Sequence, residues 1–254
     1  KAKLLFAKMP ALVANGYRAV NGKPFIKPNP KLSYTANFLA MLAGKKELHP
    51  FAVKTFDVTL ILYAEHGFNA STFSGRVTAS TLSDFYSSIA SAIGTLKGPL
   101  HGGANEQVMY MLKEIGTPDK ADAFIKEALA QKKKLMGFGH RLYRTGDSRT
   151  PIIKKMGREL AEKLGNTKWH DIADVAEAAM LREKNIFPNL DFPVATAYYV
   201  MGLPIDVYTP IFAASRVTGW AAHIIEQHNN NRLIRPSSRY VGPALRTVTP
   251  LSAH

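Results

Sequence analysis

A histidine set between small residues is the first feature of this chain that could do chemistry. His101 lies in residues 98–103, with the sequence GPLHGG, where regular helix hydrogen bonds cannot position it. The glycines allow a ligand to approach the backbone closely, and the helix expected directly afterwards would turn its positive end toward the loop. That field predicts a neutral imidazole able to donate a hydrogen bond to a carbonyl oxygen. A tight turn with an incidental histidine explains the spacing equally well.

A second histidine, His140, follows a Gly-x-Gly loop in a strongly basic segment. Residues 136–144 read MGFGHRLYR, three lysines stand at 132–134, and Arg149 comes shortly after. Guanidinium and ammonium groups at this density predict a cradle for phosphate or carboxylate. A solvated basic helix end is the alternative, and the Gly-x-Gly loop lacks the preceding strand that a dinucleotide-binding fold requires.

Asp191, Arg216 and His66 complete the set of candidate groups. Asp191 lies in residues 187–193, FPNLDFP, and apolar surroundings raise the pKa of a carboxyl group, which suits a general base. An aspartate that caps the next helix is the alternative, and these residues alone favour it. Arg216 stands in a mostly apolar helix and needs an anionic partner, either a bound carboxylate or a structural Asp or Glu. His66, before Gly67, is typical of a structural histidine at a helix end.

Helices must position these groups, because apolar residues recur with helical periodicity along most of the chain. Sustained alternation of period two is absent, so strands should be few and short. We predict an all-α fold whose glycine-rich breaks carry the binding groups. The predicted helices cover residues 1–18, 33–43, 52–65, 71–80, 83–96, 104–115, 118–131, 151–164, 171–184 and 208–228.

The composition of the 254 residues narrows the classes of function. Hydrophobic residues make up 46%, enough for a sizeable core, and the absence of cysteine excludes disulfides and a cysteine nucleophile. No metal site is predicted, since no His-Glu-x-x-His spacing occurs. No apolar run nears the roughly 20 residues that span a bilayer, and we expect a cytoplasmic protein with no membrane partner. The net charge of +14 favours anionic partners, which leaves a basic helical nucleic-acid-binding protein as an alternative.

In this order and at these separations, the candidate segments resemble the citrate synthase family over essentially the whole chain. Residues 98–103 and 137–141 are similar to its two histidine motifs, and residues 188–192 to its aspartate motif. The resemblance implies a two-domain, all-helical homodimer that needs no cofactor beyond its acyl-CoA substrate and binds no nucleic acid. Members are normally longer at the N-terminus, and this chain begins inside an apolar-periodic pattern, so we expect an incomplete large domain. The expected division is 1–101, large domain; 102–195, small domain on the CoA side; and 196–254, large domain and C-terminal arm.

The resemblance also implies roles in joining acetyl-CoA to oxaloacetate, in the manner of a Si-type condensing enzyme. Asp191 would remove a proton from the acetyl group, His101 would stabilise the enol, and His140 would polarise the oxaloacetate carbonyl. The citryl-CoA formed would then be hydrolysed to citrate and CoA. The residues implied in oxaloacetate binding are His66, Arg149, Arg216 and, from a second subunit, Arg235. Those implied in holding the CoA phosphates are Arg144, Lys184 and, from the lysine run, Lys132 and Lys134.

Two departures and one further resemblance bear on these expectations. The family's usual Asp-Pro-Arg reads Asp147-Ser148-Arg149, which should loosen the turn, and Tyr63 stands where a histidine is frequent. Neither departure removes a group that the chemistry needs. Residues 216–226 also resemble 2-methylcitrate synthases, which use propionyl-CoA, so that activity, or a dual one, is the alternative. A helical scaffold without activity is a third hypothesis, and the filled histidine and aspartate positions argue against it.

Overall fold

The computed structural model describes residues 1–44, 47–140, 143 and 145–248, and within these ranges it contains helices and no β-strand. The all-α prediction is confirmed. The α-helices are α1 (Ala2–Val20), α2 (Tyr34–Ala43), α3 (Pro50–Tyr63), α4 (Ala70–Ser80), α5 (Phe85–Leu96), α6 (Ala104–Ile115), α7 (Pro118–Ala130), α8 (Thr150–Lys163), α9 (Lys168–Lys184), α10 (Asp191–Val200) and α11 (Tyr208–Asn229). A short 3-10 helix, η1 (Ile205–Val207), precedes α11.

Local sequence signals explain most of the helix limits. The Ser33 side chain accepts the backbone N–H of Ala36 at the start of α2, and Gly44 ends that helix with a φ of 66°. The one helix missing from the predicted set is α10, whose residues 192–198 are all buried. A helix that is apolar on every side shows no amphipathic period, and periodicity therefore could not reveal it.

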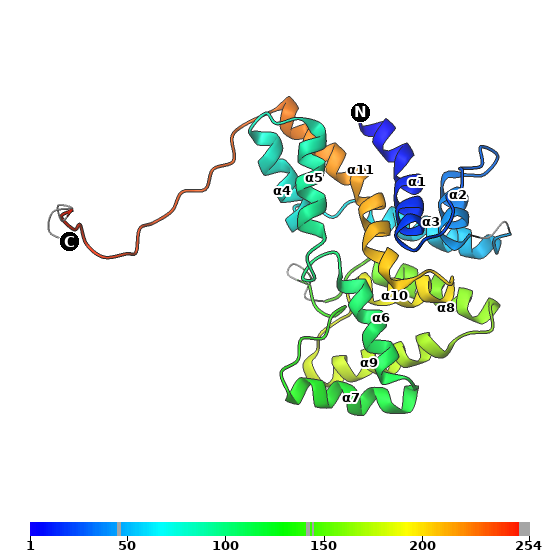
Figure 1. Cartoon of the computed structure of the whole chain (residues 1–254). Coiled ribbons are helices and arrows are strands. Elements are labelled where there is room, and N and C mark those ends of the chain that lie inside the picture. Colours follow the sequence, from blue (N-terminus) through cyan, green and yellow to red (C-terminus); the bar gives the residue numbers. More distant parts are fainter. Residues whose placement is uncertain (45–46, 141–142, 144, 249–254) are drawn as a thin grey trace.

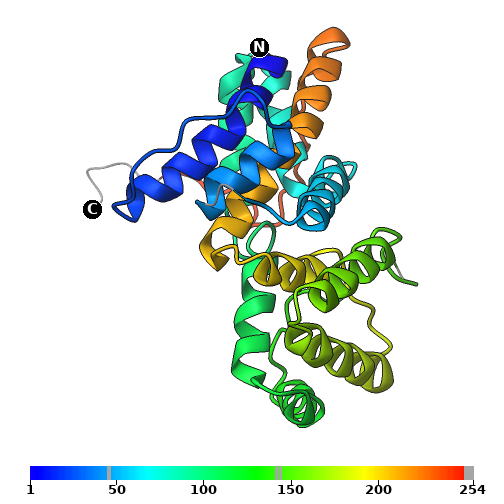
Figure 2. The ribbon, with the colours of Figure 1, turned by 90° about the vertical axis from the view of Figure 1, so that its right-hand side faces the viewer.

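The helices form two groups that are visible in both views (Figures 1 and 2). α1–α5 pack with α11 in one group, and α6–α9 lie in the other, with α10 between α6, α8 and α9. α11 contacts α1, α3, α4 and α5, and thirteen of its residues are buried, so it forms the centre of the first group. The domain limits at 101/102 and 195/196 stay a prediction.

Beyond α11 the chain continues without regular structure through residue 248 and leads away from both groups (Figure 1). Its first part is anchored on the end of α4: Asn231 Nδ2 donates to the backbone oxygen of Ser80 (3.0 Å), and the Ile234 N–H donates to the Ser80 hydroxyl (3.1 Å). Among the helices of the described ranges, none is long and apolar enough to cross a membrane.

Candidate active site

The C-terminal end of α3 is the point on which the candidate groups converge. The last carbonyl groups of an α-helix have no partner inside the helix and carry partial negative charge. Here other elements supply the donors: Arg149 Nη1 donates to the oxygen of Leu62 (3.0 Å), and Arg216 Nε donates to the oxygen of Tyr63 (2.6 Å). The fold thus brings two guanidinium groups to one helix end, although they lie far apart in the sequence.

Arg216 is buried in α11 and has a free donor. The residue is 2% exposed, and its Nη1 has no hydrogen-bond partner among the described residues. Burial, followed by the charge of Arg149, lowers the pKa of Arg216 to about 10. α11 can lie this close to α3 because Gly219 faces the oxygen of Ala64, which a Cβ atom would overlap. A buried guanidinium N–H without an acceptor favours an anionic ligand, and no structural Asp or Glu in the described ranges fills that place.

Arg149, in contrast, already has a carboxylate partner. Its Nη2 lies 2.7 Å from Asp147 Oδ2, and its Nε and backbone N–H both donate to Asp147 Oδ1 at 3.0 Å. Burial raises the pKa of Asp147, but these hydrogen bonds outweigh burial and hold the pKa below its usual value. The Asp147 carboxylate therefore bridges the turn before Arg149, and the looser turn expected from Ser148 stays a prediction.

His101 receives its hydrogen bonds from the start of α4. Its Nε2 accepts the backbone N–H of Ser71 (3.3 Å) and lies 2.9 Å from the Ser71 hydroxyl, to which Trp220 Nε1 also donates (3.1 Å). Burial, and then the charge of Arg216, lowers the pKa of His101 to about 4. Since Nε2 accepts, the neutral ring carries its proton on Nδ1. The neutral state agrees with the prediction; burial is its largest cause, and the helix end that contacts the ring is that of α4 rather than α6.

Asp191 is the first residue of α10, and its side chain makes no capping hydrogen bond. The alternative interpretation of Asp191 as a helix cap is therefore wrong. Instead its Oδ1 accepts the phenol proton of Tyr63 (2.6 Å). Burial raises the pKa of Asp191 to about 6, and the hydrogen bond from Tyr63 opposes that rise. A carboxylate with this pKa can take up a proton near neutral pH, as a general base must.

An antiparallel bridge between Phe138 and Pro188 joins the His140 loop to the loop that leads into α10. The Asn189 N–H donates to the oxygen of Gly137 (2.9 Å) within this bridge. Gly137 has a φ of 85°, and a Cβ atom there would overlap the side chain of Val108. Two motifs some fifty residues apart are thereby held side by side, which the sequence patterns did not predict.

His140 and His66 contact each other at the mouth of the site. Their Nε2 atoms are 3.2 Å apart, and the Tyr143 ring stacks on His140 with centroids 4.5 Å apart. Burial, then Arg149, lowers the pKa of His66 to about 4, and burial also lowers that of His140. The Tyr143 N–H donates to His140 Nδ1 (3.4 Å), which places the proton of a neutral His140 on Nε2. His140 is thus the donor in this pair and presents an Nε2–H group.

The loop that carries His66 is fixed from outside by side chains of α4 and α11. Glu65 Oε1 lies 2.9 Å from His223 Nε2, and Arg76 contacts His223 Nδ1 (3.0 Å). Arg76 also pairs with Glu226. His223 therefore connects the loop that carries His66 to α11. This contact, like the one between Arg216 and α3, makes α11 the support of both His66 and Arg216.

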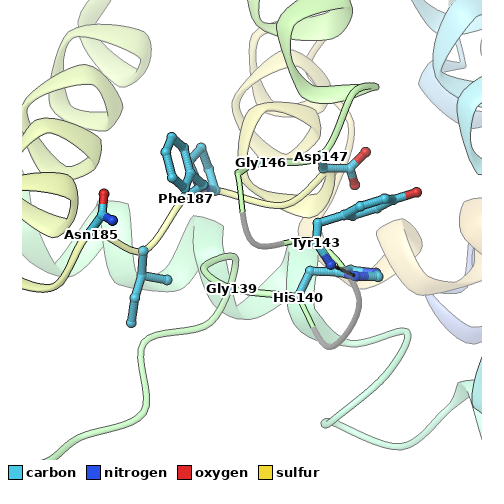
Figure 3. A pocket seen from close by; sticks show the side chains of 9 residues that line it. Gly139, His140, Tyr143, Gly146, Asp147, Asn185 and Phe187 are labelled. Carbon is cyan, nitrogen blue, oxygen red and sulfur yellow. Dashed lines mark hydrogen bonds between the residues drawn. The ribbon is translucent and has the colours of Figure 1, made fainter.

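A cavity of about 210 Å³ opens beside His140 (Figure 3). In the close-up, the Tyr143 ring lies alongside His140, with Phe187 on the far side of Gly146. Asn185, which follows the last residue of α9, also lines this cavity, and the predicted Lys184 is its neighbour in the chain. Lys132 and Lys134 are exposed after α7, and Arg144 lies outside the described residues.

In the described ranges, no contact joins Arg235 to the other predicted site residues. Arg235 is exposed in the segment after α11 that leads away from the helices (Figure 1). The sequence analysis in turn missed four groups that the site contains, namely Tyr63, Ser71, Asp147 as an ion-pair partner, and Trp220. Tyr63, Ser71 and Trp220 belong to the site through contacts with residues distant in sequence. Asp147 was considered only as part of a turn. Within the described ranges, no group of three or more His, Asp and Glu side chains could hold a metal ion.

Comparison with known families and proteins gives one consistent result. Residues 1–237 match the family described as "Citrate synthase, C-terminal domain". The chain is 47% identical over 252 residues to a citrate synthase of Haloferax volcanii, covering 99% of this chain and 66% of that protein. It is 48% identical over 251 residues to 2-methylcitrate synthase 2 of Corynebacterium glutamicum, again covering 66% of that protein. The chain thus spans about two thirds of the length of these relatives.

Solved structures show the same likeness. A citrate synthase of the archaeon Thermoplasma acidophilum, solved as a ternary complex with carboxymethyl coenzyme A and oxaloacetate, superposes with a TM-score of 0.91 at 38% identity. The match covers all of this chain and 68% of that one. The citrate synthase of Pyrobaculum aerophilum gives a TM-score of 0.88 at 44% identity, covering 100% and 64%.

Proposed function

This chain belongs to the citrate synthase family, and we propose that its site condenses acetyl-CoA with oxaloacetate and hydrolyses the citryl-CoA formed to citrate and CoA. One observation carries the proposal. A carboxyl group with a pKa of about 6 and a neutral imidazole, Asp191 and His101, lie around the end of α3 with Arg216, whose Nη1 has no hydrogen-bond partner among the described residues. This combines a base, a hydrogen-bond donor and an anion-binding group in one place.

The first half of the reaction is the removal of a proton next to a thioester. Asp191 takes the proton from the acyl carbon, and the electron pair moves onto the thioester oxygen. The negative charge that develops on this oxygen needs a hydrogen-bond donor. The neutral ring of His101 supplies its Nδ1–H group. A neutral donor suits this step because it favours an enol over a free enolate.

The second half is attack of the enol carbon on the oxaloacetate carbonyl. His140 presents its Nε2–H group to that oxygen, in exchange for the contact with His66 that it makes in this structure. The two carboxylates bind at the end of α3, where Arg216 offers a free donor and Arg149 is the second cation, with His66 as a further contact. Hydrolysis of the thioester then releases CoA.

CoA binds beside His140 in this proposal. Lys184 lies next to the cavity there, and Lys132, Lys134 and Arg144 supply further charge for its phosphates. No further cofactor and no metal takes part in the proposed reaction. The cytoplasmic location stays a prediction.

A second copy of the chain completes the proposed site through Arg235. This residue lies on the segment that leaves its own helices, so it can reach a site on another subunit without refolding the rest. A homodimer follows from this assignment. Sedimentation tests it, since a fully active monomer would remove Arg235 from the role.

The acyl group is the second point that needs a test. Relatives named citrate synthase and 2-methylcitrate synthase match this chain at 47% and 48% identity, which does not separate the two activities. One methylene group changes the preference of a pocket by only about 1–3 kcal/mol. We therefore propose 2-methylcitrate synthesis from propionyl-CoA, alone or as a dual activity, as the alternative.

The decisive experiment is a thiol-release assay on the full-length protein. Oxaloacetate is supplied with acetyl-CoA or propionyl-CoA, and released CoA is measured against a reaction without oxaloacetate. We expect release that depends on oxaloacetate with at least one acyl-CoA. No release with either, together with salt-dependent binding of DNA, would overturn the proposal in favour of the nucleic-acid alternative, which the comparisons do not support.

A further inference from the structure

We propose that Tyr63 is a positioning residue for the base: its phenol holds Asp191 Oδ1, so that Oδ2 is the oxygen that takes the substrate proton. The inference rests on the proposed function of the site. It gives a role to the tyrosine that stands where a histidine is frequent, because its hydroxyl contacts the carboxylate directly (2.6 Å).

The phenol is fixed from three sides. Tyr63 is 2% exposed, its ring packs on Phe212 with centroids 4.2 Å apart, and its backbone oxygen accepts the Nε–H of Arg216. Asn105 Nδ2 donates to the phenol oxygen (3.4 Å), which leaves the proton of the hydroxyl for Asp191. Burial, and then the charge of Asp191, raises the pKa of Tyr63 well above its usual value, so the phenol stays a donor.

Several other groups near Asp191 also affect its ionisation. Arg149 and Arg216 lower its pKa, Asp147 raises it, and the buried phenol of Tyr198, also on α10, lies close enough for Asp191 to raise the Tyr198 pKa.

The helices packed on α10 place both charged and neutral groups near this point, and α8, whose N-cap residue is Arg149, supplies one of the arginines named above. From α6 the neighbouring group is the neutral amide of Asn105, and from α9 it is His170, which contacts Thr196. In the proposed complex the carboxylates of oxaloacetate pair with the two arginines. The arginines then stabilise the ionised form of Asp191 less than they do without substrate. A neutral hydrogen-bond donor is unaffected by that pairing, and the phenol then favours the ionised base by itself.

The test is the pH dependence of kcat, because kcat reports the groups of the substrate complex. In Tyr63→Phe full-length protein we expect the acid limb of kcat to move up by about one pH unit, with KM for oxaloacetate changed by less than about threefold. Tyr63→His restores a donor and should return the limb part of the way. Tyr198→Phe is the matched control: it removes a buried phenol that donates to Thr59 (3.1 Å), not to Asp191, and should leave the limb in place.

If the acid limb of kcat does not move in Tyr63→Phe, or moves equally in Tyr198→Phe, the inference is overturned. Should Tyr63→Phe not fold, a fluorinated tyrosine at position 63 keeps the shape and makes the phenol a stronger donor. The limb should then move to lower pH, and an unmoved limb again overturns the inference. Failure of the proposed function is separate, since it shows as an unmodified protein that releases no CoA with either acyl-CoA.

Discussion

The two halves of the candidate site satisfy their polar groups in opposite ways. In the half built on α4, α10 and α11, His101 is held by Ser71 and Asp191 by Tyr63, while Arg216 keeps an unpartnered Nη1. In the half built on the two loops, the groups assigned to the substrate satisfy one another. There His66 contacts His140, and Asp147 pairs with Arg149.

In the first, preorganised half a ligand finds a free hydrogen-bond donor, whereas in the second half it must replace a hydrogen bond within the protein. A ligand carboxylate gains the Arg216 donor without displacing any protein group seen here, because that donor has no partner among the described residues. A ligand carbonyl gains the His140 Nε2–H only by replacing the contact with His66. The first half should therefore supply binding energy and the base, and the second half should supply selectivity for a ligand that can replace existing hydrogen bonds.

The largest expected effect comes from removing the base in the preorganised half. In Asp191→Asn, kcat should fall by about 10³-fold, because an amide cannot accept the proton, while the shape of the site and the Tyr63 donor remain. Oxaloacetate binding, measured by calorimetry, should change by less than about threefold. Turnover close to that of the unmodified protein would remove Asp191 from its role, and a lost affinity for oxaloacetate would show that the two functions are not separable.

The two arginines give the sharpest test of the comparison. Arg149→Gln leaves the carboxylate of Asp147 buried and unpaired, and we expect a loss of about 3–5 kcal/mol in the free energy of unfolding. Arg216→Gln loses the hydrogen bond to the oxygen of Tyr63 but breaks no ion pair among the described residues, so stability should fall by only about 1 kcal/mol. Oxaloacetate affinity should fall in both. Equal losses of stability, measured by denaturant unfolding, would show that the halves do not differ in the way described.

The sequence predicted the reacting groups of the site better than the groups that support them, for a physical reason. His101, Asp191 and Arg216 stand out because polar groups among glycine, proline or apolar residues have no local partner. Their supports do not stand out. Tyr63 meets Asp191 across 128 residues of chain, and an aromatic residue at the end of an apolar helix is indistinguishable from ordinary core.

The same limit applies to the fold. Ten of the helices in the described ranges follow from amphipathic periodicity, whereas α10, which carries the base, is too uniformly apolar to show a period. The bridge between Phe138 and Pro188 depends on backbone hydrogen bonds between distant loops.

The smallest expected effect is the change in protein stability with pH that comes from the buried, neutral histidines. His170 is the reference, because it belongs to neither half of the site. It is 4% exposed, its Nδ1 has no partner among the described residues, and burial lowers its pKa to about 4. A histidine whose pKa is lower in the folded state stabilises the protein above its unfolded pKa, and this contribution is lost as pH falls. For His170 the loss between pH 7 and pH 5 should be about 2 kcal/mol.

Asp191 works in the opposite direction, because its pKa is raised on folding, so its ionisation costs stability as pH rises toward 6 and above. His170→Gln should therefore flatten the fall in unfolding free energy from pH 7 to pH 5, and Asp191→Asn should steepen it. Denaturant unfolding at the two pH values measures both slopes. His101 and His66, whose pKa values are also lowered to about 4, lie in different halves of the site. If His170→Gln leaves the slope of unfolding free energy against pH unchanged, those two histidines, rather than burial in general, set the acid sensitivity. The corresponding glutamine variants would then measure the contribution of each half.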